Sequence, residues 1–282
     1  MRNMTTDKKA LRLFFIIIVI MSVIFEGGYI ISSNVRGTQS LLIMLGLMWT
    51  PGIAGIVTSF VYYKKQNAMG IRLGKVRYIL LGIFIPFAYL GGSYVISWLL
   101  LGDKTIGLEG IFQRLGYIAE SGTTQAAFIV RFLIVGLLTS CISALGEELG
   151  WRGFLYPVME RVLGRKRAVL YGGMIWACWH MPLIIAGLYQ SETKLWYGLP
   201  MFAIVVTQLS GVMAWLRMVS GSVIPALMIH ASHNLFDQSI FQTMSTNEKV
   251  PYLAGEQGVI TAICLAIIVT YYFSKKRNQD EK

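Results

Sequence analysis

The unusual polar residues of this apolar chain fall into three short motifs. The first covers residues 147–152 and reads Glu-Glu-Leu-Gly-Trp-Arg, the second runs over 176–180, and the third over 230–234. All three histidines of the protein lie in the last two motifs. Ionisable side chains within apolar segments are costly to hold in a membrane, so they indicate a functional site. The combination of carboxylates and imidazoles suggests an enzyme.

The spacing in the first motif predicts two carboxylates with different surroundings. Residues four apart lie almost above one another on an α-helix, so Glu148 and Arg152 can form an ion pair along one face. Glu147 is turned by about 100° from Glu148, so it can face a cavity. A carboxylate in such a cavity is the better general base. Spacing alone does not say which glutamate has which role, and a structural ion pair at a helix end gives the same pattern.

The two histidine motifs predict further parts of one site. Trp176 precedes His180 by four residues, so its indole can pack against the imidazole. His230 precedes Asn234 by four, so both can act as paired donors to an oxyanion. His233 lies about 60° around the helix from His230, so whether it belongs to the same site stays open. A histidine in an apolar helix can also serve packing alone, but three polar clusters at similar depth favour one site in the inner half of a bilayer.

The composition predicts an all-α, polytopic membrane protein. The 282 residues are 55% hydrophobic and 14% charged, whereas a soluble domain usually has about 25% charged residues. Apolar runs of about 20 residues recur along the chain. The weakest of them is the seventh, which is short and polar, but a helix surrounded by other helices tolerates such residues. We expect eight spans, at roughly 11–32, 39–62, 77–101, 126–150, 168–189, 197–219, 222–238 and 256–274.

The basic residues predict the orientation of the chain. The net charge is +11, and the lysines and arginines cluster in alternate connections between the apolar runs. The positive-inside rule then places both termini in the cytoplasm of a multi-pass cell-membrane protein, with the lipid bilayer and not nucleic acid as its surroundings. The connection at 102–125 also has apolar residues at helical spacing, which predicts an amphipathic helix on the outer face. These residues are Leu108, Ile111, Phe112, Leu115 and Ile118.

The three motifs, in this order, resemble those of the CPBP family, which groups CAAX proteases with bacteriocin-processing and bacteriocin-immunity proteins. The resemblance covers about residues 126–238. We therefore expect one folded unit with three parts: an N-terminal three-span region with the interfacial helix at 1–125, a catalytic core at 126–238, and a last span with a basic tail at 239–282.

The resemblance implies an eight-helix intramembrane glutamic endopeptidase. In such an enzyme Glu147 and His180 would activate a water molecule, and His230 with Asn234 would form the oxyanion hole. The expected substrate is a membrane peptide or a lipidated protein tail, cleaved at the cytoplasmic side. The residues expected to support the four catalytic groups are Glu148, Arg152 and Trp176, the last of which stands where the family often has Phe.

Several other chemistries are unsupported by the sequence. It contains no Gly-x-Ser-x-Gly elbow, no His-Glu-x-x-His motif and no phosphate-binding loop before a Lys-Ser/Thr pair. We expect neither a metal nor another cofactor, although two histidines and a glutamate could bind zinc as three ligands with water. Two functions from other classes stay open: a non-catalytic membrane protein that binds a peptide and confers bacteriocin immunity, and a transporter with a Glu/His proton relay.

Overall fold

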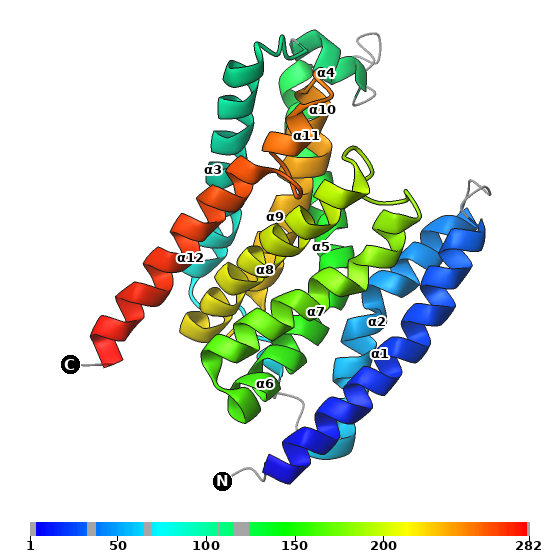
Figure 1. The fold of residues 1–282 in the computed structure, drawn as a ribbon, viewed down its shortest axis with the longest axis vertical. Coiled ribbons are helices and arrows are strands. Elements are labelled where there is room, and N and C mark those ends of the chain that lie inside the picture. Colours follow the sequence, from blue (N-terminus) through cyan, green and yellow to red (C-terminus); the bar gives the residue numbers. More distant parts are fainter. Residues whose placement is uncertain (1–3, 33–37, 65–68, 107, 115–123, 281–282) are drawn as a thin grey trace.

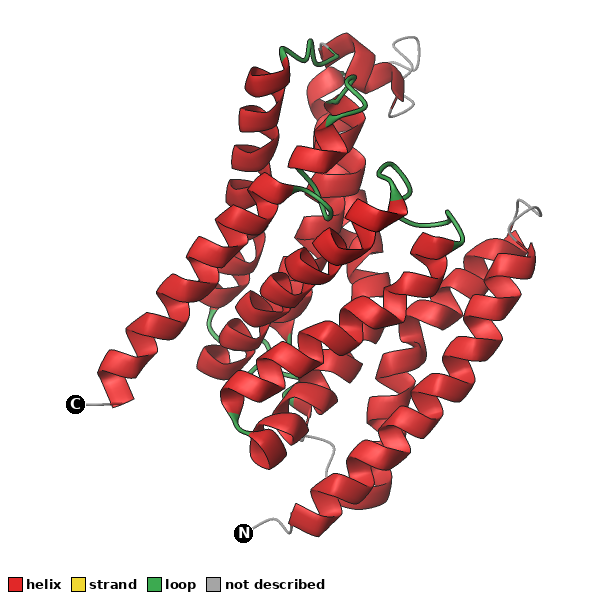
Figure 2. Ribbon diagram, viewed as in Figure 1, coloured by secondary structure: helices red, strands yellow, loops and turns green. Residues whose placement is uncertain are grey.

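Helices form all the regular structure in the described part of the chain (Figures 1 and 2). The computed structural model describes residues 4–32, 38–64, 69–106, 108–114 and 124–280. The prediction of an all-α protein is confirmed. The helices, with π-helical segments written η, are α1 (Met4–Ser32), α2 (Thr38–Tyr63), α3 (Val76–Leu101), α4 (Leu108–Arg114), α5 (Gln125–Glu148), η3 (Leu149–Leu155), α6 (Tyr156–Leu163), α7 (Arg165–Ile185), α8 (Leu195–Ser220), α9 (Ile224–Asn234), η4 (Leu235–Phe241), α10 (Gln242–Met244), α11 (Val250–Leu253) and α12 (Val259–Asp280).

Six helical segments of the described chain are long and apolar enough to cross a membrane. This finding confirms a multi-pass membrane protein. The seventh predicted span corresponds to the short α9 and its continuation η4, and the eighth to the apolar stretch Val259–Phe273 of α12. The total of eight therefore stays a prediction. The six segments are Met4–Ser32, Leu41–Tyr63, Val76–Leu101, Gln125–Leu163, Arg165–Ile185 and Leu195–Ser220.

The short helix α9 is enclosed by longer ones, which explains its polar composition. It packs against α3, α5 and α8, while α7 lies beside α8, and α12 covers α8 and α3 (Figure 1). The pair α1 and α2 lies on the other side of the bundle, with α2 against α5 and η3. Helix α1 begins and α12 ends near the same end of the bundle (Figure 1). The side of the membrane on which that end lies stays a prediction.

Close approach of α2 fixes the segment that carries the first motif. A Cβ on Gly150 would lie 2.3 Å from the backbone carbonyl of Pro51, and a Cβ on Gly146 would lie 2.7 Å from the Cα of Trp49. Only residues without a side chain allow backbones to pack this closely. The end of α5 and the start of η3 are thus held against α2.

The predicted amphipathic helix at 102–125 is observed in part, as α4. Phe112 is buried there, with its ring centroid 6.1 Å from that of Phe128 at the start of α5. Leu115 and Ile118 lie outside the described residues. The position of α4 on the outer face of a membrane stays a prediction.

Candidate active site

The three polar motifs converge inside the helix bundle. The first lies at the junction of α5 and η3, the second on α7 and the third on α9. Glu147, Glu148 and Arg152 are each at most 2% exposed, and His180 and His230 are 7% and 5% exposed. A π-helical segment, η3, begins directly after Glu148, and such segments occur frequently at functional sites.

Glu148 lies between a guanidinium and an imidazole. Nη1 of Arg152 donates to its Oε1 at 2.7 Å, so the ion pair suggested by the spacing forms. Nδ1 of His230 lies 2.9 Å from the same oxygen. The guanidinium of Arg152 also lies over the indole of Trp176, 4.2 Å from the ring centroid. Glu148 is therefore a charge-balanced carboxylate that orients His230.

Glu147 has a different environment, as the sequence predicts. Its Oε2 accepts hydrogen bonds from the indole N–H groups of Trp176, at 2.7 Å, and Trp151, at 3.4 Å. Nε2 of His180 lies 4.0 Å from Oε2, and Nε2 of His230 lies 4.0 Å from Oε1. These separations are too long for direct hydrogen bonds but suit one bridging water each. The carboxylate is thus anchored by indoles and faces two imidazoles.

His180 is held in one orientation by its own helix and by aromatic rings. Its Nδ1 lies 2.9 Å from the backbone carbonyl of Trp176, so Nδ1–H donates and Nε2 is directed towards Glu147. The rings of Trp179 and Tyr189 lie 4.8 and 5.5 Å away, centroid to centroid. The indole of Trp176 makes the contact expected from the sequence, edge-on at 5.8 Å.

Two residues of the third motif are not joined to this arrangement by hydrogen bonds. Asn234 is half-buried on α9, and its side chain makes no hydrogen bond to a described residue. Its role in an oxyanion hole stays a prediction. His233 contacts Tyr89 and lies 3.1 Å from Oε1 of Glu256, in a separate cluster.

Sequence reasoning missed two side chains around the site. Trp151 stands four residues after Glu147, so the same spacing rule that paired Glu148 with Arg152 could have found its hydrogen bond. Tyr189, which stacks on His180, lies in the connection after α7 and carries no motif. Nothing in the sequence marks it.

The possible ligand atoms of Glu147, His180 and His230 lie too far apart to share one zinc ion, as the zinc alternative requires. Within the described chain, three His, Cys, Asp or Glu ligand atoms lie within 4.8 Å of one another at a single place, formed by His233, Asp237 and Glu256. Glu147, His180 and His230 do not form such a group. Their spacing suits water between the side chains better than a shared ion.

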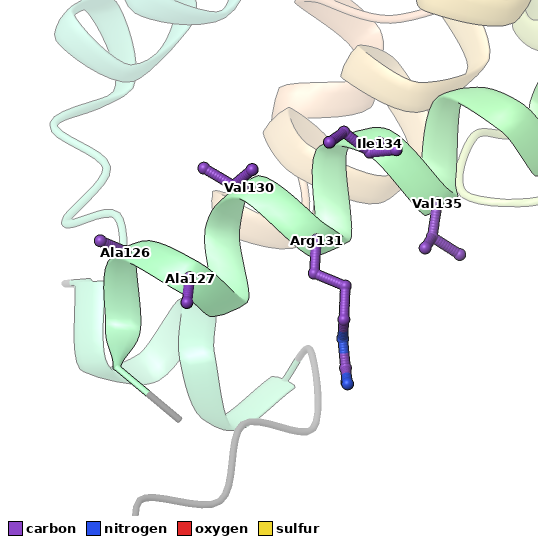
Figure 3. A pocket seen from close by; sticks show the side chains of 6 residues that line it. All are labelled: Ala126, Ala127, Val130, Arg131, Ile134 and Val135. Atoms are coloured by element: carbon purple, nitrogen blue, oxygen red, sulfur yellow. The ribbon is translucent and has the colours of Figure 1, made fainter. Parts of the chain in front are cut away.

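A large apolar hollow lies away from the three motifs, on the first part of α5 (Figure 3). Its volume is about 520 Å³. Its lining ends at Val135, twelve residues before Glu147 and hence about 18 Å along the helix. The hollow is therefore not part of the candidate active site. Its lining residues are Ala126, Ala127, Val130, Arg131, Ile134 and Val135.

The sequence of this chain is similar to a known family model and to a known protein. Residues 129–236, which contain all three motifs, match the family model described as Type II CAAX prenyl endopeptidase Rce1-like. A "CAAX prenyl protease 2" of Methanococcus maripaludis is 28% identical over 255 residues, which is 87% of this chain and 87% of the relative. The resemblance inferred from the motifs is confirmed, and the two matches support a membrane protease of the CPBP/CAAX type.

Proposed function

We propose that the protein cleaves peptide bonds by a glutamate- and histidine-activated water molecule. The observation that carries this proposal is the position of Glu147, whose two carboxylate oxygens each lie 4.0 Å from an imidazole Nε2, of His180 and of His230. A water bridging Glu147 and His180 would be polarised by both groups. General-base catalysis of this kind contributes about 10²–10⁴-fold to a rate.

The second imidazole would stabilise the charge that develops on the attacked carbonyl. Nδ1 of His230 lies 2.9 Å from Glu148 and its Nε2 lies 4.0 Å from Glu147, so a doubly protonated imidazole would donate Nδ1–H to Glu148. The Nε2–H group is then available to the oxyanion, and Asn234, one helical turn later, would supply the second donor. Glu147 would carry the proton of the attacking water to the leaving amine.

The proposed substrate is a membrane peptide or a lipidated protein tail, cleaved near the cytoplasmic surface. Its support is the printed name of the relative, a prenyl protease, together with the basic connections that predict the orientation. A site enclosed by helices that can span a membrane would receive the apolar part of such a substrate from the lipid.

Mass spectrometry of membrane peptides from cells that express the parent protein or Glu147→Gln tests this proposal. We expect cleaved termini that appear with the parent and disappear with Glu147→Gln and His180→Ala. The control is Glu160→Gln, which removes a partly exposed carboxylate paired with Arg165 and should leave cleavage unchanged. Identical peptides from the parent and Glu147→Gln would contradict the proposal, and retained peptide immunity in Glu147→Gln would favour a non-catalytic binder.

A further inference from the structure

A second cluster of buried ionisable side chains lies beside the active site and has no part in the proposed reaction. It consists of His233 on α9, Asp237 on η4 and Glu256 in the turn before α12. Their exposed fractions are 1%, 2% and 4%. Each offers a ligand atom, and these three atoms lie within 4.8 Å of one another.

Each of the three side chains forms a hydrogen bond with a tyrosine hydroxyl. These hydrogen bonds leave Nε2 of His233, 3.1 Å from Oε1 of Glu256, and the second carboxylate oxygen of Asp237 as the atoms that can reach an ion. Outer hydrogen bonds that fix the tautomer and rotamer of each ligand are typical of metal sites. The pairs are Tyr89 with Nδ1 of His233, Tyr94 with Oδ1 of Asp237 at 2.7 Å, and Tyr189 with Oε2 of Glu256 at 2.6 Å.

The charges of the cluster call for a cation. Asp237 and Glu256 are both buried, and no lysine or arginine within the described ranges pairs with either carboxylate. Glu148, in contrast, has its own buried arginine. The imidazole of His233, 3.1 Å from Glu256, can balance at most one of the two negative charges, whereas one divalent ion would neutralise both.

The distances and ligand types suit a transition-metal ion. Nε2 of His233 and Oε1 of Glu256 are 3.1 Å apart, and an ion bound to both at about 2.0–2.2 Å would need little movement of either. One imidazole with two carboxylates is a ligand set that zinc accepts, with water in the fourth position. The π-helical η4, which carries Asp237, begins two residues after His233, and such segments often mark functional sites.

We propose that His233, Asp237 and Glu256 bind a divalent transition-metal cation, for which zinc is the best match. The ion would tie α9 and η4 to the turn that precedes α12. The ion would also be connected to the active site through Tyr189, which donates a hydrogen bond to Glu256 and stacks on His180. Neither Asp237 nor Glu256 lies within the stretch matched by the family model.

Elemental analysis of protein purified with a tag that contains no histidine tests the site. After incubation with zinc and desalting, we expect one zinc ion per chain in the parent. Asp237→Asn should lose it, and zinc should raise the Tm of the metal-depleted parent but not of this variant. Tyr94→Phe keeps all three ligands and serves where Asp237→Asn does not fold. Its affinity for zinc should fall about 10–100-fold.

The matched control separates this site from the proposed catalytic one. Glu147→Gln should lose cleavage and still bind one zinc ion, so the two proposals can fail independently. A zinc content no higher than background in the folded parent would overturn the metal site and leave a hydrogen-bonded cluster in its place. Zinc retained by Asp237→Asn, unchanged affinity in Tyr94→Phe, or zinc lost from Glu147→Gln would also overturn it.

Discussion

Replacing Arg152 with methionine should destabilise the protein strongly. Arg152 and Glu148 are 2% and 0% exposed, and their charged atoms are 2.7 Å apart. Removal of one partner from a buried ion pair costs about 3–5 kcal/mol, because the other charge stays buried. His230, 2.9 Å from Glu148, can take up a proton and offset part of this cost. We therefore expect the free energy of unfolding to fall by about 3 kcal/mol. At about 2–4 °C per kcal/mol, this corresponds to a Tm decrease of roughly 6–12 °C.

Thermal unfolding in detergent micelles, followed by tryptophan fluorescence, measures this effect. The control is Arg165→Met, because the pair of Arg165 with Glu160 has a similar distance, 3.0 Å, but side chains 36% and 30% exposed. An exposed pair contributes about 0–1 kcal/mol. Combining Arg152→Met with Glu148→Gln should recover most of the lost stability, since no uncompensated carboxylate remains. A Tm of Arg152→Met equal to that of the control, or no recovery in the double variant, would refute the reasoning.

Two further substitutions test the anchoring of Glu147 and the contact of its segment with α2. Trp176→Phe removes the 2.7 Å hydrogen bond to Glu147, worth about 1.5–3 kcal/mol. The kcat should fall about tenfold to a hundredfold. The control Trp98→Phe loses a neutral hydrogen bond to Ser245 and should keep its kcat, and equal values for the two variants would contradict this role. Gly150→Ala places a Cβ 2.3 Å from the α2 backbone and should cost about 1–3 kcal/mol in unfolding experiments. Gly172→Ala, with open space around it, should cost less, and equal stabilities would contradict the close contact.

Local spacing predicts those parts of the site that lie within one helix. The pair of Glu148 and Arg152 and the contact of Trp176 with His180 both follow from positions four residues apart. The pair forms even though η3 is π-helical, which the sequence does not reveal. Within a helix, therefore, neighbours in the sequence largely determine neighbours in space.

Contacts between helices could not be predicted in the same way. The sequence indicates that the three motifs reach similar depth, but it does not show that His230 bonds Glu148 while facing Glu147. The cluster around Glu256 was missed because Glu256 and its hydrogen-bond partner Tyr189 lie in connections without any motif. The eighth span illustrates a similar limit, since hydropathy alone does not show whether the short apolar stretch Val259–Phe273 of α12 spans a membrane or packs on other helices.

A double-variant cycle on Glu147 and His180 tests the central claim most directly. Cleavage of a peptide reconstituted in liposomes would be measured for the parent, Glu147→Gln, His180→Ala and the double variant. If both side chains act on one water, each single variant should lose most of the kcat, and the double variant should be no slower than the slower single one. Rate losses that multiply in the double variant, or substantial cleavage by Glu147→Gln, would contradict a water activated jointly by these two residues.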